Sequence, residues 1–199
     1  MTGLLTGALP DTVRVSGRTW PVRTDYRVWL ELITVMNGDL TPGEKLARVL
    51  TLCYPAVPED LPAAVEALAW FFRCGAPAPG QAETAGASVP LCFSPEEDAA
   101  LLTASFQQAY GMDLTAERVH WWRFRALLEG LPEETVLCRV MSLRAADERD
   151  LQALDPGLRQ QLRRLKRRYR LKRRQPESLS ARDAGLMRYV AARLDGKEG

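Results

Sequence analysis

Histidine is nearly absent from this 199-residue sequence, which contains only His120. Nucleophilic catalysis by serine or cysteine needs a base within reach of the nucleophile, and a single histidine leaves little from which to build such a site. The sequence also lacks glycine-rich phosphate-binding loops, the GxSxG motif of hydrolases and the HExxH motif of metallopeptidases. These absences predict a protein that is not an enzyme and that binds no cofactor.

Cysteine is scarce as well, and its spacing does not suggest a zinc site. The four cysteines lie far apart, without the CxxC spacing of zinc ligands: Cys53, Cys74, Cys92 and Cys138. We expect them to be buried free thiols in a reducing compartment. The acidic triplet at 96–98 stands at a predicted helix start, where a favourable interaction with the helix dipole explains it. The sequence therefore predicts no metal site.

Long hydrophobic runs are also missing. No apolar run approaches the roughly 18 residues that a membrane span requires, so we expect no integral membrane segment. The first twelve residues lack the basic region that begins a secretory signal peptide, so we expect no export by that route. Hydrophobic residues make up 46% of the sequence and charged residues 26%, which is typical of a globular protein with its own core.

Charge is unevenly distributed, although the net charge is only +2. Ten Lys or Arg residues and no acidic residue stand between Arg159 and Arg174, so the remaining 17 basic and 25 acidic residues give a net charge of −8. We call the core of this run the basic arm, and it consists of Arg163, Arg164, Lys166, Arg167, Arg168, Arg170, Lys172, Arg173 and Arg174.

Three interpretations of the basic arm remain open. Its cations either solvate the outer face of a helix, dock an acidic protein partner, or bind nucleic-acid phosphates with Tyr169 stacking on a base. Leucines in this segment keep helical spacing, so one face of the helix is expected to pack against another element. This register favours the first two interpretations over nucleic-acid binding.

Local patterns predict a mainly α fold. Val13 and Val15 alternate with polar residues before the turn residues Ser16 and Gly17, and Trp20 begins a return strand, which predicts a small β-hairpin. Caps, glycine stops and apolar spacing predict helices over residues 25–37, 41–53, 60–72, 94–110, 115–129, 132–143, 147–174 and 180–194. The expected fold is a helical domain with an N-terminal hairpin and a long basic C-terminal helix.

Glycine, proline, alanine and serine fill most positions of residues 74–90, which predicts a flexible linker. The expected organisation has four parts. These are an N-terminal hairpin with helices over 1–73, the linker over 74–90, a helical core with an aromatic cluster over 91–146, and a basic helical arm over 147–199.

Aromatic residues concentrate at His120, Trp121, Trp122 and Phe124. Adjacent residues on a helix point roughly 100° apart, so both tryptophans cannot point to the centre of one narrow core. One is expected to be buried against the preceding helix, and the other is covered by a neighbouring element or exposed at an interface. His120 is expected to be a packing or recognition residue.

The segments TDYRVWLEL, FSPEED, LLTASFQQAYGMDL, HWWRFRALLEGL and VMSLR occur in an order that resembles the phage gene-product-fifteen family. The resemblance covers roughly residues 13–172, and siphophages and prophages of Gram-positive bacteria encode this family. It implies a tail-morphogenesis protein encoded beside the tape-measure protein, in the position of the tail-assembly chaperones. Such chaperones coat the tape measure in the host cytoplasm until tail-tube subunits replace them.

The implied partner is the tape-measure protein or another tail protein, and a homo-oligomer is compatible with the sequence. An amphipathic partner helix would lie in an apolar groove between helices. Candidate partner-binding residues are the large aromatics expected at or near helix surfaces: Tyr26, Trp29, Trp70, Phe106, Tyr110, Trp121, Trp122 and Phe124. The alternatives are a tail or head–tail component that stays in the virion, or a nucleic-acid-binding phage protein that uses the basic arm.

Overall fold

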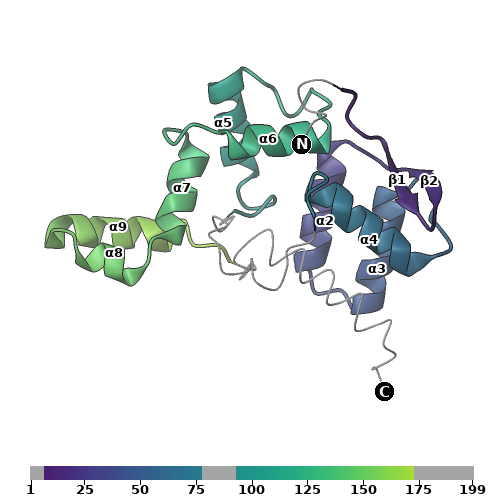
Figure 1. Cartoon of the computed structure of the whole chain (residues 1–199). Coiled ribbons are helices and arrows are strands. Elements are labelled where there is room, and N and C mark those ends of the chain that lie inside the picture. The colour runs from purple at the N-terminus through teal and green to yellow at the C-terminus, as the bar shows by residue number, and fades with distance from the viewer. Residues whose placement is uncertain (1–6, 78–92, 173–199) are drawn as a thin grey trace. The chain divides into compact units, whose positions relative to one another are not determined.

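A computed structural model describes residues 7–77 and 93–172 of the chain (Figure 1). These residues form two compact units. The first unit comprises residues 7–77 and 118–129, and the second comprises residues 93–117 and 130–172. The first unit is therefore discontinuous in sequence.

Two strands and four helices make up the described part of the first unit: β1 (Thr12–Val15), β2 (Arg18–Pro21), α2 (Tyr26–Asn37), α3 (Pro42–Cys53), α4 (Leu61–Phe72) and α6 (Trp121–Glu129). Helix α2 packs against α3 and α6, while α4 packs against α3 and β1. The hairpin and the three N-terminal helices run from purple to blue in Figure 1. Their apolar faces enclose the core of the unit.

The predicted hairpin is confirmed. Strands β1 and β2 are antiparallel, with Val13 opposite Trp20 and Val15 opposite Arg18. The connecting residues Ser16 and Gly17 have φ angles of 48° and 80°, as a tight two-residue hairpin turn requires. Both valines are buried, so the hairpin contributes one face to the core.

Helices α2, α3 and α4 begin where their capping residues predict. The carboxylates of Asp25 and Asp60 each accept a backbone N–H from the first turn of the following helix. Thr41 and Glu44 form a capping box at the start of α3, because each side chain bonds the backbone N–H of the other residue. These caps satisfy N–H groups that have no partner within the helix.

Four helices make up the described part of the second unit: α5 (Ala99–Tyr110), α7 (Val136–Ala145), α8 (Glu148–Gln152) and α9 (Pro156–Arg168). Helix α7 packs against α5 and α9, and α8 packs against α9. Gly111, with φ 66°, ends α5 as predicted. Phe106 and Leu137 are fully buried between α5 and α7, where Ser105 Oγ also accepts the Leu137 N–H at 3.2 Å.

A buried ion pair ties the second unit together. Arg144 of α7 donates to both carboxylate oxygens of Asp98 at 2.6 and 2.8 Å. The Asp98 carboxylate also accepts the Ser94 N–H at 2.8 Å, and Arg144 Nε donates to the Tyr169 carbonyl at 2.6 Å. Only 10% of the Arg144 side chain and 3% of the Asp98 side chain are exposed. The pair therefore links the start of α5, the end of α7 and the residue that follows α9.

The structure does not support one long basic helix from residue 147. Helix α8 ends at Gln152, and α9 starts at Pro156 after an N-cap at Asp155, whose side chain accepts the Gly157 N–H. Proline has no N–H to donate, so it is suited to a helix start and cannot continue the preceding helix. Residues 173–199, which include Arg173, Arg174 and the helix predicted over 180–194, lie outside the described residues.

Two further helix starts differ from the prediction. Residues 95–98 form turns, and regular α5 begins only at Ala99. Helix α6 begins at Trp121 and not near residue 115, because residues 117–119 are non-helical and His120 forms a β-bridge. This helix also packs within the first unit, whereas the sequence placed it with the helical core over 91–146. Most of the expected linker, residues 78–90, lies outside the described residues.

We expect Arg144→Ala to lower the free energy of unfolding by about 3–5 kcal/mol, because it leaves the buried Asp98 carboxylate without its cation. Urea denaturation followed by circular dichroism measures the change. Arg139→Ala on the exposed face of α7 is the matched control, with an expected change within about 0.5 kcal/mol. Equal losses for the two variants would show that the ion pair does not hold the unit together.

Candidate functional site

Aromatic side chains gather at the centre of the first unit. Trp29 of α2 stacks on Phe71 of α4, with ring centroids 4.8 Å apart, and lies 6.0 Å from Trp121 of α6. Tyr26 stacks on Phe124 with centroids 4.5 Å apart. We call the whole group the aromatic cluster, and it consists of Tyr26, Trp29, Trp70, Phe71, Phe72, His120, Trp121, Trp122 and Phe124.

The two tryptophans of α6 cap the C-terminal end of α4. The last carbonyl groups of a helix have no partner within the helix. Trp121 Nε1 donates to the Phe72 carbonyl at 3.0 Å, and Trp122 Nε1 donates to the Phe71 carbonyl at 2.9 Å. Arg125 Nη1 adds a second donor to the Phe72 carbonyl at 3.1 Å. Residues of α6 thus satisfy the end of a helix that lies about fifty positions earlier in the sequence.

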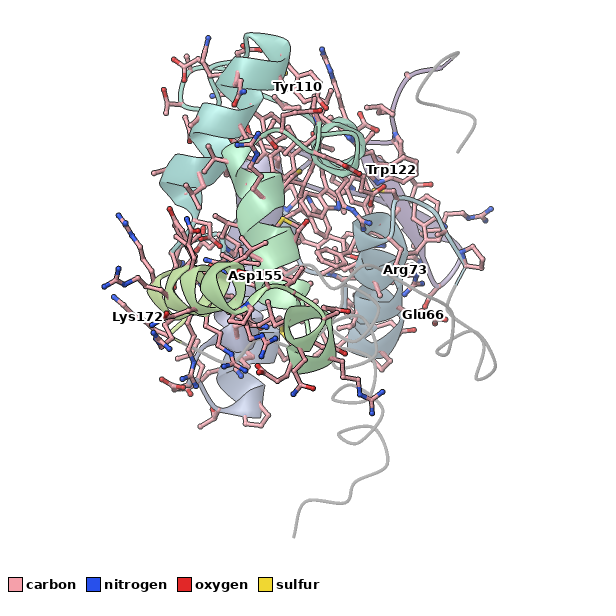
Figure 2. All side chains as sticks on the ribbon, turned by 90° about the vertical axis from the view of Figure 1, so that its left-hand side faces the viewer. Glu66, Arg73, Tyr110, Trp122, Asp155 and Lys172 are labelled. Atoms are coloured by element: carbon pink, nitrogen blue, oxygen red, sulfur yellow. The ribbon has the colours of Figure 1, made fainter. Side chains whose placement is uncertain are left out.

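Both tryptophans are buried, with 1% of Trp121 and 8% of Trp122 exposed. The sequence left open whether the second one is covered or exposed at an interface, and the structure shows it covered. Trp121 stacks on Phe72 and Trp122 packs against Phe71, so both rings lie against the end of α4. Both tryptophans stand in the first turn of α6, and this turn meets the end of α4. Their side chains point in different directions, so each indole reaches a different one of two neighbouring carbonyl groups. Figure 2 labels Trp122 and, just after α4, Arg73.

A short antiparallel bridge joins the starts of α2 and α6. The Tyr26 N–H donates to the Val119 carbonyl at 2.9 Å, and the Trp121 N–H donates to the Thr24 carbonyl at 2.7 Å. The bridge pairs Asp25 with His120. Sequence reasoning missed this contact, because one isolated pair of residues produces no period-2 pattern to detect.

His120 is the N-cap of α6 and is held by backbone groups on both sides of its ring. Nε2 lies 2.9 Å from the Pro10 carbonyl, which can only accept, so Nε2 carries the proton. Nδ1 accepts the Trp122 N–H at 3.0 Å. Burial lowers the pKa of His120, which favours the neutral ring that these two bonds require. With both nitrogens engaged, the only histidine has no free lone pair for a general base.

The chain leaves α4 through a Schellman motif. Cys74 and Gly75 have φ angles of 58° and 79°, and their N–H groups donate to the Phe71 and Trp70 carbonyls, each at 3.0 Å. A Cβ atom on Gly75 would lie 3.0 Å from Trp122 Cη2 and 3.4 Å from Trp70 Cζ2. Glycine therefore lets the backbone pass closely over these two indole rings.

The structure separates the candidate partner-binding residues into core and surface. Trp70 is the exposed member of the set, with 38% of its surface accessible, and it meets Trp122 edge to face with centroids 5.6 Å apart. Tyr110 is half-buried in the second unit, where it packs against Phe106. The buried members are Tyr26, Trp29, Phe106, Trp121, Trp122 and Phe124. These six form cores in the described structure, and a surface contact is available to Trp70.

The basic arm lies on and after α9. Arg163, Arg164, Lys166, Arg167 and Arg168 belong to the helix, and Arg170 and Lys172 follow it. Figure 2 labels Asp155 at the N-cap of this helix and Lys172 beyond its end. No residue of α9 is buried, and even Leu158, in its apolar stripe, is 46% exposed.

Within residues 7–77 and 93–172, no group of three or more His, Cys, Asp or Glu side chains could hold a metal ion. None of the helices in these two segments is both long enough and apolar enough to cross a membrane. The described surface carries the exposed Trp70, other exposed apolar side chains such as Leu61 and Leu158, and the cations of α9.

Comparison with known proteins gives a family match over most of the chain. The family model described as Bacteriophage Gp15 protein matches residues 5–171. No curated protein and no solved structure matches the chain. The family match includes every described helix and both strands.

We expect Trp121→Ala to lower the free energy of unfolding by about 3–5 kcal/mol, since it removes a buried ring and one of the donors to the Phe72 carbonyl. Trp70→Ala removes a half-covered ring, and its expected loss is only about 1 kcal/mol. Urea denaturation monitored by circular dichroism measures both. Similar losses for the two variants would contradict the division into core and surface.

Stability should fall as the pH drops below about 6.5, the ordinary pKa of histidine. The pKa of His120 is lowered in the folded state, so below pH 6.5 the unfolded chain takes up a proton that the folded chain does not. His120→Asn keeps a side-chain acceptor at the N-cap without titrating, and this variant should lose the pH dependence that sets in just below about pH 6.5. Thermal melts at each pH measure it, and parallel curves for both proteins would contradict the assignment.

Proposed function

The chain belongs to the bacteriophage Gp15 family, and from this premise we propose that it is a non-enzymatic phage tail-morphogenesis protein. It acts as a tail-assembly chaperone that binds the tape-measure protein, or another tail protein, in the cytoplasm of the bacterial host. The chaperone role rests on the resemblance of this chain to proteins encoded beside the tape measure. The structure contributes a candidate contact residue.

That residue is Trp70. Its ring is exposed to solvent on one side and packed against Trp122 on the other, and this observation carries the proposal. Tryptophan is enriched among the residues that dominate protein–protein binding energy. Trp70 rests edge-on against Trp122, and Gly75 lies against both rings. Because its position is fixed before binding, a partner that covers Trp70 loses little conformational entropy in ordering it.

The surroundings of Trp70 suit an approaching helix. Ala63, Glu66 and Trp70 recur at spacings of three and four along α4, so they share its outer face. A small residue beside a large aromatic one lets a partner helix approach closely and pack its apolar side against the indole. The apolar area on this face is modest, which favours a weak contact. A weak contact suits a chaperone that tail-tube subunits must displace.

The surroundings of two groups that could do chemistry, His120 and Cys53, support the non-enzymatic part of the proposal. Both nitrogens of His120 are bonded to backbone groups. Cys53 is buried, and burial raises the pKa of its thiol, which keeps the sulfur protonated and a poor nucleophile. Neither group has the exposure or the protonation state of a catalytic residue.

Co-expression with the cognate tape-measure protein tests the proposal. The wild-type chain should raise the soluble fraction of the tape measure, and Trp70→Ala should remove most of that gain while keeping its own helical content. Leu40→Ala is the matched control, since Leu40 is an equally exposed apolar residue of the first unit and should retain the gain. An unchanged soluble fraction with the wild-type chain would sink the chaperone role.

Mass spectrometry of purified phage particles separates the chaperone from a structural tail or head–tail component. A chaperone is released before the particle is complete, so its peptides should be absent from particles whose tube and tape-measure peptides are readily detected. Peptides of this chain at the abundance of a tail protein would favour the structural role instead.

A further inference from the structure

The cations of α9 fall into two groups, one bonded to other parts of the second unit and one exposed to solvent. Arg159 donates to backbone carbonyls at the end of α8 and after it, at 2.9 and 2.8 Å. Lys166 donates to the Ala146 carbonyl, and Arg163 pairs with Glu148. These three side chains lie on one side of the helix and fasten α9 to the rest of the second unit.

The other group points away from these contacts. At 100° per residue, Arg164, Arg167 and Arg168 lie on a different side of the helix from the leucine stripe, together with Gln160 and Gln161. All five residues are exposed. No side-chain hydrogen bond or ion pair joins Arg164 or Arg167 to another described residue, and the Arg168 guanidinium lies 5.8 Å from the Tyr169 ring centroid. We call this surface the arginine face: Gln160, Gln161, Arg164, Arg167 and Arg168.

The composition of the arginine face indicates the kind of partner. It has no apolar side chain, whereas the binding energy of protein–protein interfaces concentrates in a desolvated core of aromatic and apolar groups. Guanidinium groups match phosphate oxygens with two parallel hydrogen bonds, and glutamine amides also contact phosphates. Eight of the ten cations between residues 159 and 174 are arginines. The face therefore suits phosphate better than an acidic helix that also needs apolar contacts.

We propose that the arginine face binds the phosphodiester backbone of nucleic acid, without reading its sequence. Helix α9 is about 20 Å long, so its outer face extends past several phosphates of a duplex. The chain outside residues 159–174 carries a net charge of −8, which repels nucleic acid and confines the contact to this segment. The leucine register that favoured a protein partner belongs to a different side of the helix, so it does not argue against this contact.

Fluorescence anisotropy with the full chain tests the proposal. The probes are a labelled DNA duplex of about 20 base pairs and a single-stranded RNA of similar length, each at about 50 and 200 mM salt. The wild-type chain should bind at the lower salt and weaken steeply at the higher salt. The triple variant Arg164→Gln, Arg167→Gln, Arg168→Gln should bind at least tenfold more weakly, with a salt slope lower by about three.

A charge-matched control separates the arginine face from the effect of net charge. Arg118→Gln, Arg123→Gln, Arg139→Gln removes the same charge from exposed positions elsewhere and should bind nearly as the wild type does. Circular dichroism should show the same helical content for both triple variants. Equal affinity for duplex and single strand supports a backbone contact, and a preference identifies which nucleic acid is the ligand.

Three outcomes would overturn the proposal. The first is no binding to either probe at the lower salt, where phosphate contacts are strongest. The second is an equal loss of nucleic-acid affinity in the two triple variants, which would show that net charge alone causes the binding. The third is binding to poly-glutamate as tight as binding to nucleic acid, which would make the arginine face a surface for acidic protein segments.

Discussion

The first unit depends on the carbonyl groups at the C-terminal end of α4, which lie inside the protein and need hydrogen-bond donors. The indole N–H groups of Trp121 and Trp122 supply them. To do so the indoles must lie against Phe71 and Phe72, and this placement brings α6 onto Trp29 of α2. Hydrogen bonding of these carbonyls and packing of the aromatic rings therefore require the same arrangement of α2, α4 and α6. The polar atoms of these rings explain why tryptophan stands at both positions.

Features that depend on neighbouring residues could be predicted from the sequence. The caps at Asp25, Thr41 and Asp60 and the stop at Gly111 each follow from the chemistry of a few adjacent residues. The start of α6 could not, because it is set by pairing with Thr24, far away in the sequence, and such a pair leaves no local pattern. The break before Pro156 was visible as an Asp-Pro pair, but regular leucine spacing on both sides concealed it.

Most candidate partner-binding residues proved to be core residues, and the reason again lies in contacts between residues far apart in the sequence. An aromatic residue with a polar neighbour looks the same in sequence whether its ring faces a partner or a helix end. The hydrogen bonds of the indoles and the burial of the rings show which tryptophans belong to the core. By the same observations, Trp70 lies at the surface. The cations of α9 posed the same problem, since a run of arginines does not reveal which ones bond backbone carbonyls. The first unit thus offers an exposed tryptophan, and the second offers a row of exposed arginines.

The discontinuity of the first unit has a consequence for biosynthesis. Residues 7–77 leave the ribosome well before Trp121 is translated, so the nascent unit waits with the Phe72 carbonyl lacking its donors from α6 and with aromatic rings facing solvent. Its core closes only when α6 arrives, which gives the unit long-range contacts and a slower final folding step than its short helices alone would have. A chain truncated before α6 would expose the faces that Trp121 and Trp122 cover, and aggregation would compete with folding.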